Sequence, residues 1–356
     1  MASQGDTTGS AKRSPRRSGR GPTVADVARL AGVSPMTVSR VVNAEARVTP
    51  KTRERVEAAI AELGYVPNLA ARSLAGGRQF RIALLYANPS AAYLSEFLVG
   101  ALAEADACDA QLQVEPCAEG EDAAALAARL ARHRIDAVLL PPPLCDDSAL
   151  IAALTAAGLP MAQVATGIPS PLAHAVTIDD EAAAHAVTAR LIAAGHRRIG
   201  FIAGNPNQTA SALRRAGHQR ALAEAGIAAD PALMAEGDFT FRSGLTAAAT
   251  LLAAQPRPTA IFASNDDMAA AAMALAHRQG LDVPATLSIC GFDDTALATA
   301  TWPELTTVRQ PVSDMARRAT RLLVEALAQD SKDGHPRHER LAFTLIERES
   351  DGPPPA

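Results

Sequence analysis

Short, mostly apolar runs recur between about residue 80 and residue 350 of the chain, and they alternate with alanine-rich stretches of helical length. A strand that is apolar at every position is buried on both faces, as in parallel sheets covered by helices. The alternation therefore predicts an α/β fold, and about 270 residues suit two such units better than one. The predicted strands are 82–86, 112–114, 137–140, 162–164, 175–178, 199–202, 260–263 and 287–290, and the predicted helices include 121–133, 182–194, 209–225, 242–254 and 266–279.

Residues 23–63 follow a different pattern, in which apolar positions recur at helical spacing. Thr23 is a predicted N-cap, and Asp26 three residues later completes a capping box. Gly32 permits a sharp turn, after which Ser34 and Pro35 restart the chain as N-cap and first helical residue. Each helix is predicted to bury one apolar face. In the first helix this face comprises Val24, Val27, Ala28 and Ala31, and in the second Val38, Val41 and Val42.

A third helix is predicted from Thr49-Pro50 to Gly64, with Val56, Ala59, Ile60 and Leu63 at helical spacing. Two short helices joined by a glycine turn, with a third to complete the core, are typical of a helix-turn-helix DNA-binding domain. The pattern alone also fits a generic small helical domain.

Charge is divided unevenly between the two ends of the chain. Residues 1–80 hold 13 Lys/Arg and 6 Asp/Glu, a net of +7, whereas residues 81–356 hold 21 and 32, a net of −11. A basic head and an acidic body are expected of a protein whose N-terminal part alone binds nucleic acid. Residues 1–21, rich in Ser, Gly, Arg and Lys, are predicted to be a disordered basic arm, and the proline-rich residues 350–356 a disordered tail.

Several classes of protein are disfavoured. The sequence has no apolar run of about 20 residues and no signal-peptide pattern, so we expect a cytoplasmic protein with no membrane contact. Four scattered cysteines without metal-ligand spacing indicate a reducing compartment and no structural metal. No phosphate-binding glycine loop, nucleophile elbow or HExxH motif is present. We therefore expect no enzyme activity, no catalytic residues and no cofactor.

The residue identities in the N-terminal segment are more specific than its hydrophobic pattern. It reads Val24-x-Asp26-Val27-Ala28-x-x-Ala31-Gly32-Val33-Ser34-x-x-Thr37-Val38-Ser39-Arg40-Val41-Val42-Asn43, followed by Thr52-Arg53-x-Arg55-Val56 and Leu63-Gly64-Tyr65-x-Pro67-Asn68. This closely resembles the LacI/GalR family of bacterial transcription regulators. The resemblance implies a DNA-binding domain over residues 22–66, followed by a hinge helix and linker over 67–79.

The resemblance also implies how DNA would be read. Pro35, Met36 and Arg40 would face base edges in the major groove, with Arg40 the best candidate for a bidentate guanine contact. Leu74 of the hinge helix would insert into the minor groove. The remaining residues expected at the DNA, chiefly through phosphates and register, are Thr23, Ser34, Thr37, Ser39, Asn43 and Asn68.

Resemblance extends through Gly195-His196-x-x-Ile199-Gly200-Phe201-Ile202, Ser264-Asn265-Asp266-x-Met268-Ala269, Gly291-Phe292-Asp293-Asp294 and Leu305-Thr306-Thr307-Val308-x-Gln310-Pro311. These segments imply an effector-binding core over residues 80–349, similar to periplasmic sugar-binding proteins, with two Rossmann-like subdomains. Three crossovers would place about 80–178 and 310–340 in the N-subdomain, and about 179–309 and 341–349 in the C-subdomain. Residues carried over to the effector cleft are Tyr93, Arg214, Phe239, Asn265, Asp293 and Gln310.

Other interpretations remain open at some of these positions. Ser264, Asn265 and Asp266 precede a predicted helix and could simply cap it, and Asp293 could be a turn residue. Pro141 and Ala165 depart from the lactose-repressor pattern, which has an amide and an acid there, so galactoside recognition is in doubt.

The sequence as a whole predicts a homodimeric repressor of carbohydrate-utilisation genes. It would bind a palindromic double-stranded DNA operator under the control of a sugar or glycoside. A regulator that responds to a purine or another metabolite is the alternative, and a ligand-binding protein without DNA function is a more distant one.

Overall fold

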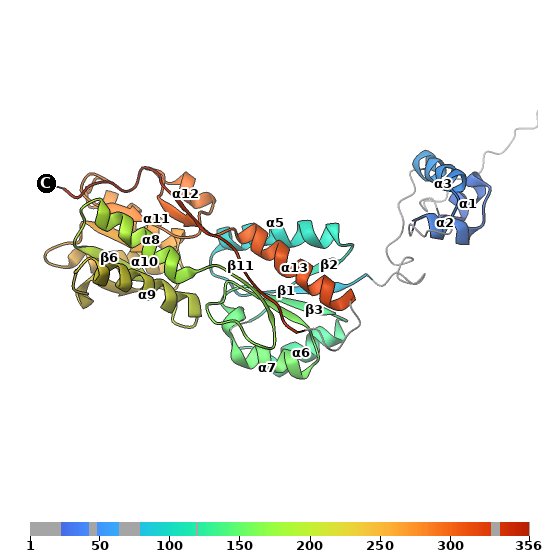
Figure 1. Ribbon diagram of the computed structural model, residues 1–356, viewed down its shortest axis with the longest axis horizontal. Helices are drawn as coiled ribbons and strands as arrows, with labels where there is room; N and C mark the ends of the chain where they lie inside the picture. Colours follow the sequence, from blue (N-terminus) through green and yellow to red (C-terminus); the bar gives the residue numbers. More distant parts are fainter. Residues whose placement is uncertain (1–22, 43–47, 64–78, 119, 329–334, 356) are drawn as a thin grey trace, which may run out of the picture. The chain divides into compact units, whose positions relative to one another are not determined.

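The computed structural model describes residues 23–42, 48–63, 79–118, 120–328 and 335–355, and these form two separate units (Figure 1). The division falls between Gln79 and Phe80. The N-terminal unit is helical and the C-terminal unit is α/β, which are the two classes that the hydrophobic pattern predicts.

The N-terminal unit consists of α1 (Val24–Ala31), α2 (Pro35–Val42) and α3 (Pro50–Leu63). The predicted capping box is present, because the Thr23 hydroxyl accepts from the Asp26 amide and the Asp26 carboxylate accepts from the Thr23 amide. Gly32 ends α1 in the left-handed region at φ 62°. The Ser34 hydroxyl accepts from the Thr37 amide at 3.1 Å, as expected of the cap of α2. One small core joins the three helices through Val27, Ala28, Ala31, Val38, Val41, Val56 and Ala59.

The first lobe of the C-terminal unit is built on a six-stranded parallel sheet in the order β11-β5-β4-β3-β1-β2. Helices α5 and α13 cover one face of this sheet and α6 and α7 the other (Figure 1). The strands are β1 (Arg81–Tyr86), β2 (Gln111–Pro116), β3 (Ala137–Leu140), β4 (Met161–Val164), β5 (His174–Thr177) and β11 (His338–Arg340). The helices are α5 (Ala91–Ala107), α6 (Ala123–Arg132), α7 (Ser148–Ala156), α13 (Val312–Ala328) and the short η1 (Leu144–Asp146).

The second lobe is built on a four-stranded parallel sheet in the order β7-β6-β8-β9. A two-stranded antiparallel sheet, β10 with β12, continues from β9 through isolated bridges. The strands are β6 (Ile199–Ala203), β7 (Met234–Glu236), β8 (Ala260–Ala263), β9 (Ser288–Cys290), β10 (Thr307–Arg309) and β12 (Thr344–Ile346). The helices are α8 (Asp180–Ala193), α9 (Thr209–Glu224), α10 (Phe241–Ala253), α11 (Asp266–Arg278), α12 (Ala296–Ala300) and η2 (Pro231–Leu233).

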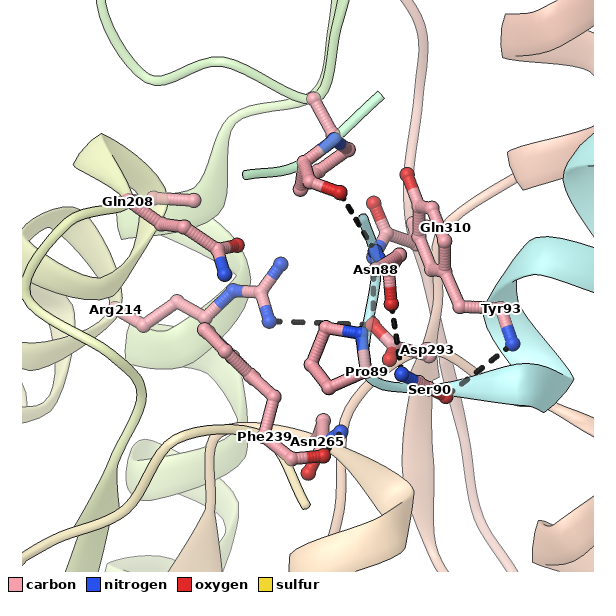
Figure 2. Close-up of a pocket in the computed structure, with 13 residues that line it drawn as sticks. Asn88, Pro89, Ser90, Tyr93, Gln208, Arg214, Phe239, Asn265, Asp293 and Gln310 are labelled. Atoms are coloured by element: carbon pink, nitrogen blue, oxygen red, sulfur yellow. Dashed lines mark hydrogen bonds and ion pairs between the residues drawn. The ribbon is translucent and has the colours of Figure 1, made fainter. Parts of the chain in front are cut away.

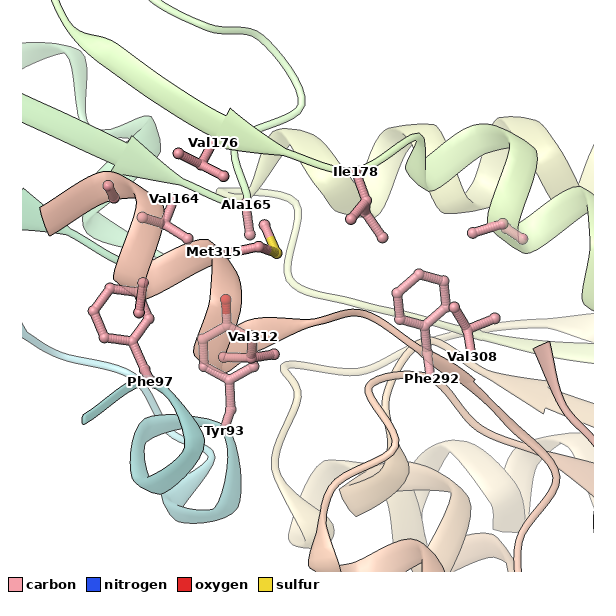
Figure 3. Close-up of a cluster of buried hydrophobic side chains, with 14 of the residues drawn as sticks. Tyr93, Phe97, Val164, Ala165, Val176, Ile178, Phe292, Val308, Val312 and Met315 are labelled. Carbon is pink, nitrogen blue, oxygen red and sulfur yellow. The ribbon is translucent and has the colours of Figure 1, made fainter. Parts of the chain in front are cut away.

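The chain passes between the two lobes three times, at residues 178–180, 309–312 and 340–344, as the strand pairings show. Apolar side chains from both lobes meet along these passages in one continuous cluster (Figure 3). Ile178, Phe292, Val308 and Val312 lie there and are at most 4% exposed. Packing around these three passages therefore holds the lobes together there. A ligand site can form where the lobes face each other.

The expectation of a disordered tail is wrong for residues 350–355. Ser350 is fully buried and its hydroxyl donates to the Ile289 carbonyl. The Asp351 carboxylate accepts from Arg190 Nε at 2.7 Å and from the Thr306 hydroxyl at 2.6 Å. A proline-rich segment cannot form a helix, but it can lie extended against a sheet edge when side chains such as these bind it.

Candidate functional site

One pocket between the lobes is lined by all six residues that were predicted to meet an effector (Figure 2). Four of the six come from different elements or their ends: Tyr93 from α5, Arg214 from α9, Asn265 from the end of β8, and Asp293 from the turn after β9. The other lining residues are Phe239, Gln310, Asn88, Pro89, Ser90, Pro142, Ala165, Gln208 and Ala210. The carboxyl ends of the parallel strands thus converge on one site, as open α/β sheets generally arrange.

Arg214 is the electrostatic centre of the pocket and is only 4% exposed. Its Nε donates to the Asp180 carboxylate at 2.8 Å, and its Nη1 donates to the Ser264 carbonyl at 2.6 Å and lies 3.9 Å from Asp293 Oδ1. The guanidinium carbon also lies 3.6 Å from the centre of the Phe292 ring, a cation–π contact. Two buried carboxylates and an aromatic face therefore hold this guanidinium in one position.

Asp293 is held on its own side of the pocket by the backbone and by Gln310. Its φ of 115° is a conformation that residues other than glycine rarely adopt, which points to a functional constraint on this turn. Gln310 Nε2 donates to Asp293 Oδ1 at 2.6 Å. Burial raises the pKa of Asp293 to about 7, although Arg214 and Gln310 act to lower it. Asp293 therefore lies close to the midpoint of its titration near neutral pH.

Three buried side-chain atoms of the described residues lack a hydrogen-bond partner: Tyr93 Oη, Gln310 Oε1 and Asp180 Oδ2. Two of these side chains, Tyr93 and Gln310, line the pocket. A buried polar group without a partner is costly, and few occur in native proteins. Their presence on one pocket wall suits a ligand that offers hydrogen bonds at that place.

Asn265 lines the pocket, but its side chain is largely committed to the protein. Its Oδ1 accepts from the Met268 amide at 3.0 Å and so caps α11, and its Nδ2 donates to the Phe239 carbonyl at 3.0 Å. The capping interpretation is thus borne out for Asn265. It is wrong for Asp266, whose carboxylate instead accepts from Thr295, before α12, and from Thr307 of β10.

The sequence reasoning missed several residues of the pocket. Ser90 has the signature of an N-cap, a serine directly before a helix and after an Asn-Pro pair, and that signal could have identified it. Asp180 does not line the pocket but pairs with Arg214, which does. It follows a predicted strand and could have been found by the rule that already selected Asp293. Of the three consecutive prolines, Pro142 lines the pocket and Pro141 does not. Ala165 lines it as well.

Six of the residues predicted to read DNA are described with their side chains, and they divide into two groups. Pro35, Met36 and Arg40 are exposed on α2, and the Met36 side chain is 65% exposed. Thr23, Ser34 and Thr37 take part in the caps of α1 and α2, and the Ser34 and Thr37 hydroxyls lie 2.9 Å apart. Ser39 belongs to α2, but its side chain is outside the described part of the chain. Asn43, Asn68 and Leu74 also lie outside the described residues.

Neither a metal site nor a membrane-spanning helix occurs among the described residues. No group of three or more His, Cys, Asp or Glu is placed to hold a metal ion. No helix among those described is long and apolar enough to span a bilayer.

A helix-turn-helix unit joined to a two-lobed α/β unit with a polar pocket defines the class of ligand-controlled DNA-binding regulators. Residues 23–68 match the family "Bacterial regulatory proteins, lacI family", and residues 188–350 match "Periplasmic binding protein-like domain". The chain is 36% identical over 341 residues to the HTH-type transcriptional regulator CelR of Thermobifida fusca, covering 93% of this chain and 98% of that protein. The chain belongs to the LacI family of transcription regulators.

Solved structures agree along nearly the whole chain. A complex of the transcriptional regulator CelR with cellobiose aligns with a TM-score of 0.71 at 34% identity and covers 92% of this chain and 99% of that one. The lac repressor dimer bound to operator and the anti-inducer ONPF aligns with a TM-score of 0.75 at 30% identity and covers 93% and 99%. The fold class predicted from the sequence is therefore confirmed.

Proposed function

We propose that the protein is a homodimeric, cytoplasmic repressor that binds a palindromic operator through α2 and releases it when an uncharged saccharide or glycoside occupies the pocket. The observation that carries this is the convergence of all six expected effector residues on one pocket, where two side-chain oxygens, Tyr93 Oη and Gln310 Oε1, lack a hydrogen-bond partner. The CelR–cellobiose complex and the operator-bound lac repressor dimer support the same assignment by likeness.

The charge balance of the pocket favours an uncharged effector. Arg214 is the only cationic side chain among the described residues that line it, and Asp180 and Asp293 together already exceed its charge. A phosphorylated sugar or another anion would therefore meet no uncompensated positive charge. Hydroxyl groups can both donate to the Asp293 carboxylate and accept from Arg214 or Tyr93, so a polyhydroxyl ligand suits these partners.

A ligand screen and a DNA selection test the proposal together. We expect thermal stability to rise with an uncharged mono- or disaccharide, in proportion to the logarithm of its concentration, and not with sugar phosphates. We also expect selection from random DNA to yield a two-fold symmetric site that this saccharide releases. Stabilisation by hypoxanthine or guanine alone would instead establish the purine-responsive alternative, and recovery of no specific DNA site would refute the regulator assignment.

The pKa of Asp293 leads to a prediction about stability and pH. The folded protein keeps this proton up to about pH 7, whereas an ordinary aspartate loses it near 3.8. The folded state thus binds an extra proton between these values, and the contribution of Asp293 to the free energy of unfolding falls as pH rises through this window. We expect Asp293→Asn to flatten the dependence by about one proton in urea titrations between pH 4.5 and 7.5.

A matched control is Asp122→Asn, because Asp122 is an exposed N-cap of α6 and is not among the residues that line the pocket. It should lower stability by a similar amount at every pH in that window. An unchanged pH slope in Asp293→Asn would show that another group, such as the buried Asp266, takes up the proton.

A further inference from the structure

Helix α9 of the second lobe begins at the pocket without a cap of its own. The N-cap side chains of α5, α6, α7, α8, α10 and α11 each accept a hydrogen bond from their own helix. Gln208, the N-cap residue of α9, makes no such bond. The first backbone amides of a helix need acceptors, so a partner from elsewhere is expected.

That partner is Asp146, which belongs to the first lobe. Its Oδ2 accepts from the Thr209 amide at 2.8 Å, and its Oδ1 accepts from the Thr209 hydroxyl at 2.9 Å. The Thr166 hydroxyl of the first lobe donates to the same carboxylate at 2.6 Å. The Thr209 hydroxyl in turn accepts from the Gly167 amide at 2.6 Å. One carboxylate thus joins the two lobes and caps α9 from across the gap.

A second contact crosses between the lobes by way of Ser90. The hydroxyl of Ser90, the N-cap of α5 in the first lobe, donates to Asp267 Oδ2 of α11 in the second lobe at 2.7 Å. Residues that flank both contacts line the pocket, namely Gln208, Ala210, Ala165 and Pro89. The free volume of the pocket is about 30 Å³, room for about two water molecules. A ligand the size of a sugar ring therefore enters only when these contacts open.

We infer that Asp146 is a closure latch: it holds the two lobes together through the N-terminus of α9 and sets how often the pocket opens in the absence of ligand. A hydrogen bond to a charged acceptor is stronger than one between neutral groups, and a carboxylate at a helix N-terminus also interacts favourably with the helix dipole. Opening gives up both bonds to Thr209 and leaves α9 uncapped. This inference rests on the proposed function in one respect only: the proposed function supplies the ligand whose entry the latch controls.

The latch can be tested without any ligand by the rate of thiol labelling. In full-length protein with Cys108→Ser and Cys117→Ser, Ala210→Cys places a reporter in the pocket, where Ala210 is 4% exposed. We expect Asp146→Ala to accelerate maleimide labelling of the reporter by about 10- to 100-fold, the factor given by lost hydrogen bonds to a charged group. Asp146→Asn, which keeps one acceptor oxygen, should give a smaller acceleration.

Three controls make the test specific. Asp147→Ala removes the neighbouring aspartate, which caps α7 within the first lobe, and should leave the reporter rate within about twofold. The buried native thiols Cys145 and Cys290 report unfolding of the first and second lobe and should stay unlabelled. Parallel labelling of either thiol, the same acceleration in Asp147→Ala, or an unchanged rate in Asp146→Ala would each overturn the latch. Because no ligand is present, none of these results bears on whether the pocket binds a saccharide.

Discussion

Replacing Arg214 with methionine is expected to destabilise the C-terminal unit by about 3–5 kcal/mol at pH 8, because it leaves buried carboxylates without their cation. Asp180 and Asp293 are 1% and 6% exposed, so water cannot take over the role of the guanidinium. Burial already raises the pKa of both carboxyls. Protonation relieves the unpaired charge, and the loss should therefore be smaller at pH 5 than at pH 8.

Urea unfolding at the two pH values measures this, and Arg215→Met is the matched control. Arg215 is the next residue of α9, but it pairs with Glu236 at the surface and is 39% exposed. Its substitution should change stability by less than about 0.5 kcal/mol at either pH. Equal losses at pH 5 and pH 8 for Arg214→Met would mean that lost packing against Phe292, and not unpaired charge, dominates.

The strands and helices that a local pattern specifies were predictable from the sequence. Strands β3 and β8 are apolar at each position, and the predicted bounds match the observed ones, Ala137–Leu140 and Ala260–Ala263. Helix α1 was predictable to its cap, since Thr23 and Asp26 form a motif that is local in the chain.

The elements that were missed are those whose stability comes from distant partners. Strands β7, β10, β11 and β12 have three residues each and include polar side chains. Their pairing is fixed by strands far away in the sequence, as between β11 and β5 or β12 and β10. The final segment was misjudged for the same reason, because Asp351 is held by Arg190 and Thr306, which no local pattern reveals.

The pocket shows the same division between local and distant determinants. Arg214, Asn265 and Asp293 follow from the resemblance to a family, and the structure brings them together. The resemblance does not supply the contacts that set their charge and freedom, such as the pairing of Arg214 with Asp180. Arg214 and Asp180 are 34 positions apart in the sequence, and only the folded chain makes them neighbours.

The uneven charge of the chain gains a physical meaning from the two units. The net of +7 over residues 1–80 favours the approach of the helix-turn-helix to phosphates. The net of −11 over the remainder keeps the larger unit off the nucleic acid by repulsion. A near-neutral total thus arises from two units with opposite electrostatic requirements.

Arg40→Ala is expected to weaken binding to the selected operator by about 10- to 100-fold and to leave binding to random DNA nearly unchanged, because one bidentate base contact is worth about 1–3 kcal/mol of discrimination. Arg40 is exposed near the end of α2, the helix predicted to enter the major groove. Affinity for both DNAs should be measured across a salt series. A base contact leaves the slope of log K against log salt unchanged, whereas a lost phosphate contact reduces it by about 0.9.

Arg29→Ala is the control for charge alone, since Arg29 is an exposed residue of α1 that pairs with Asp26 at 2.7 Å. It should change operator and random-DNA binding by the same factor. If Arg40→Ala behaved in the same way, with equal losses on both DNAs and a reduced salt slope, Arg40 would bind a phosphate. Sequence discrimination would then have to come from other exposed residues of α2, of which Met36 and Pro35 are the first to test.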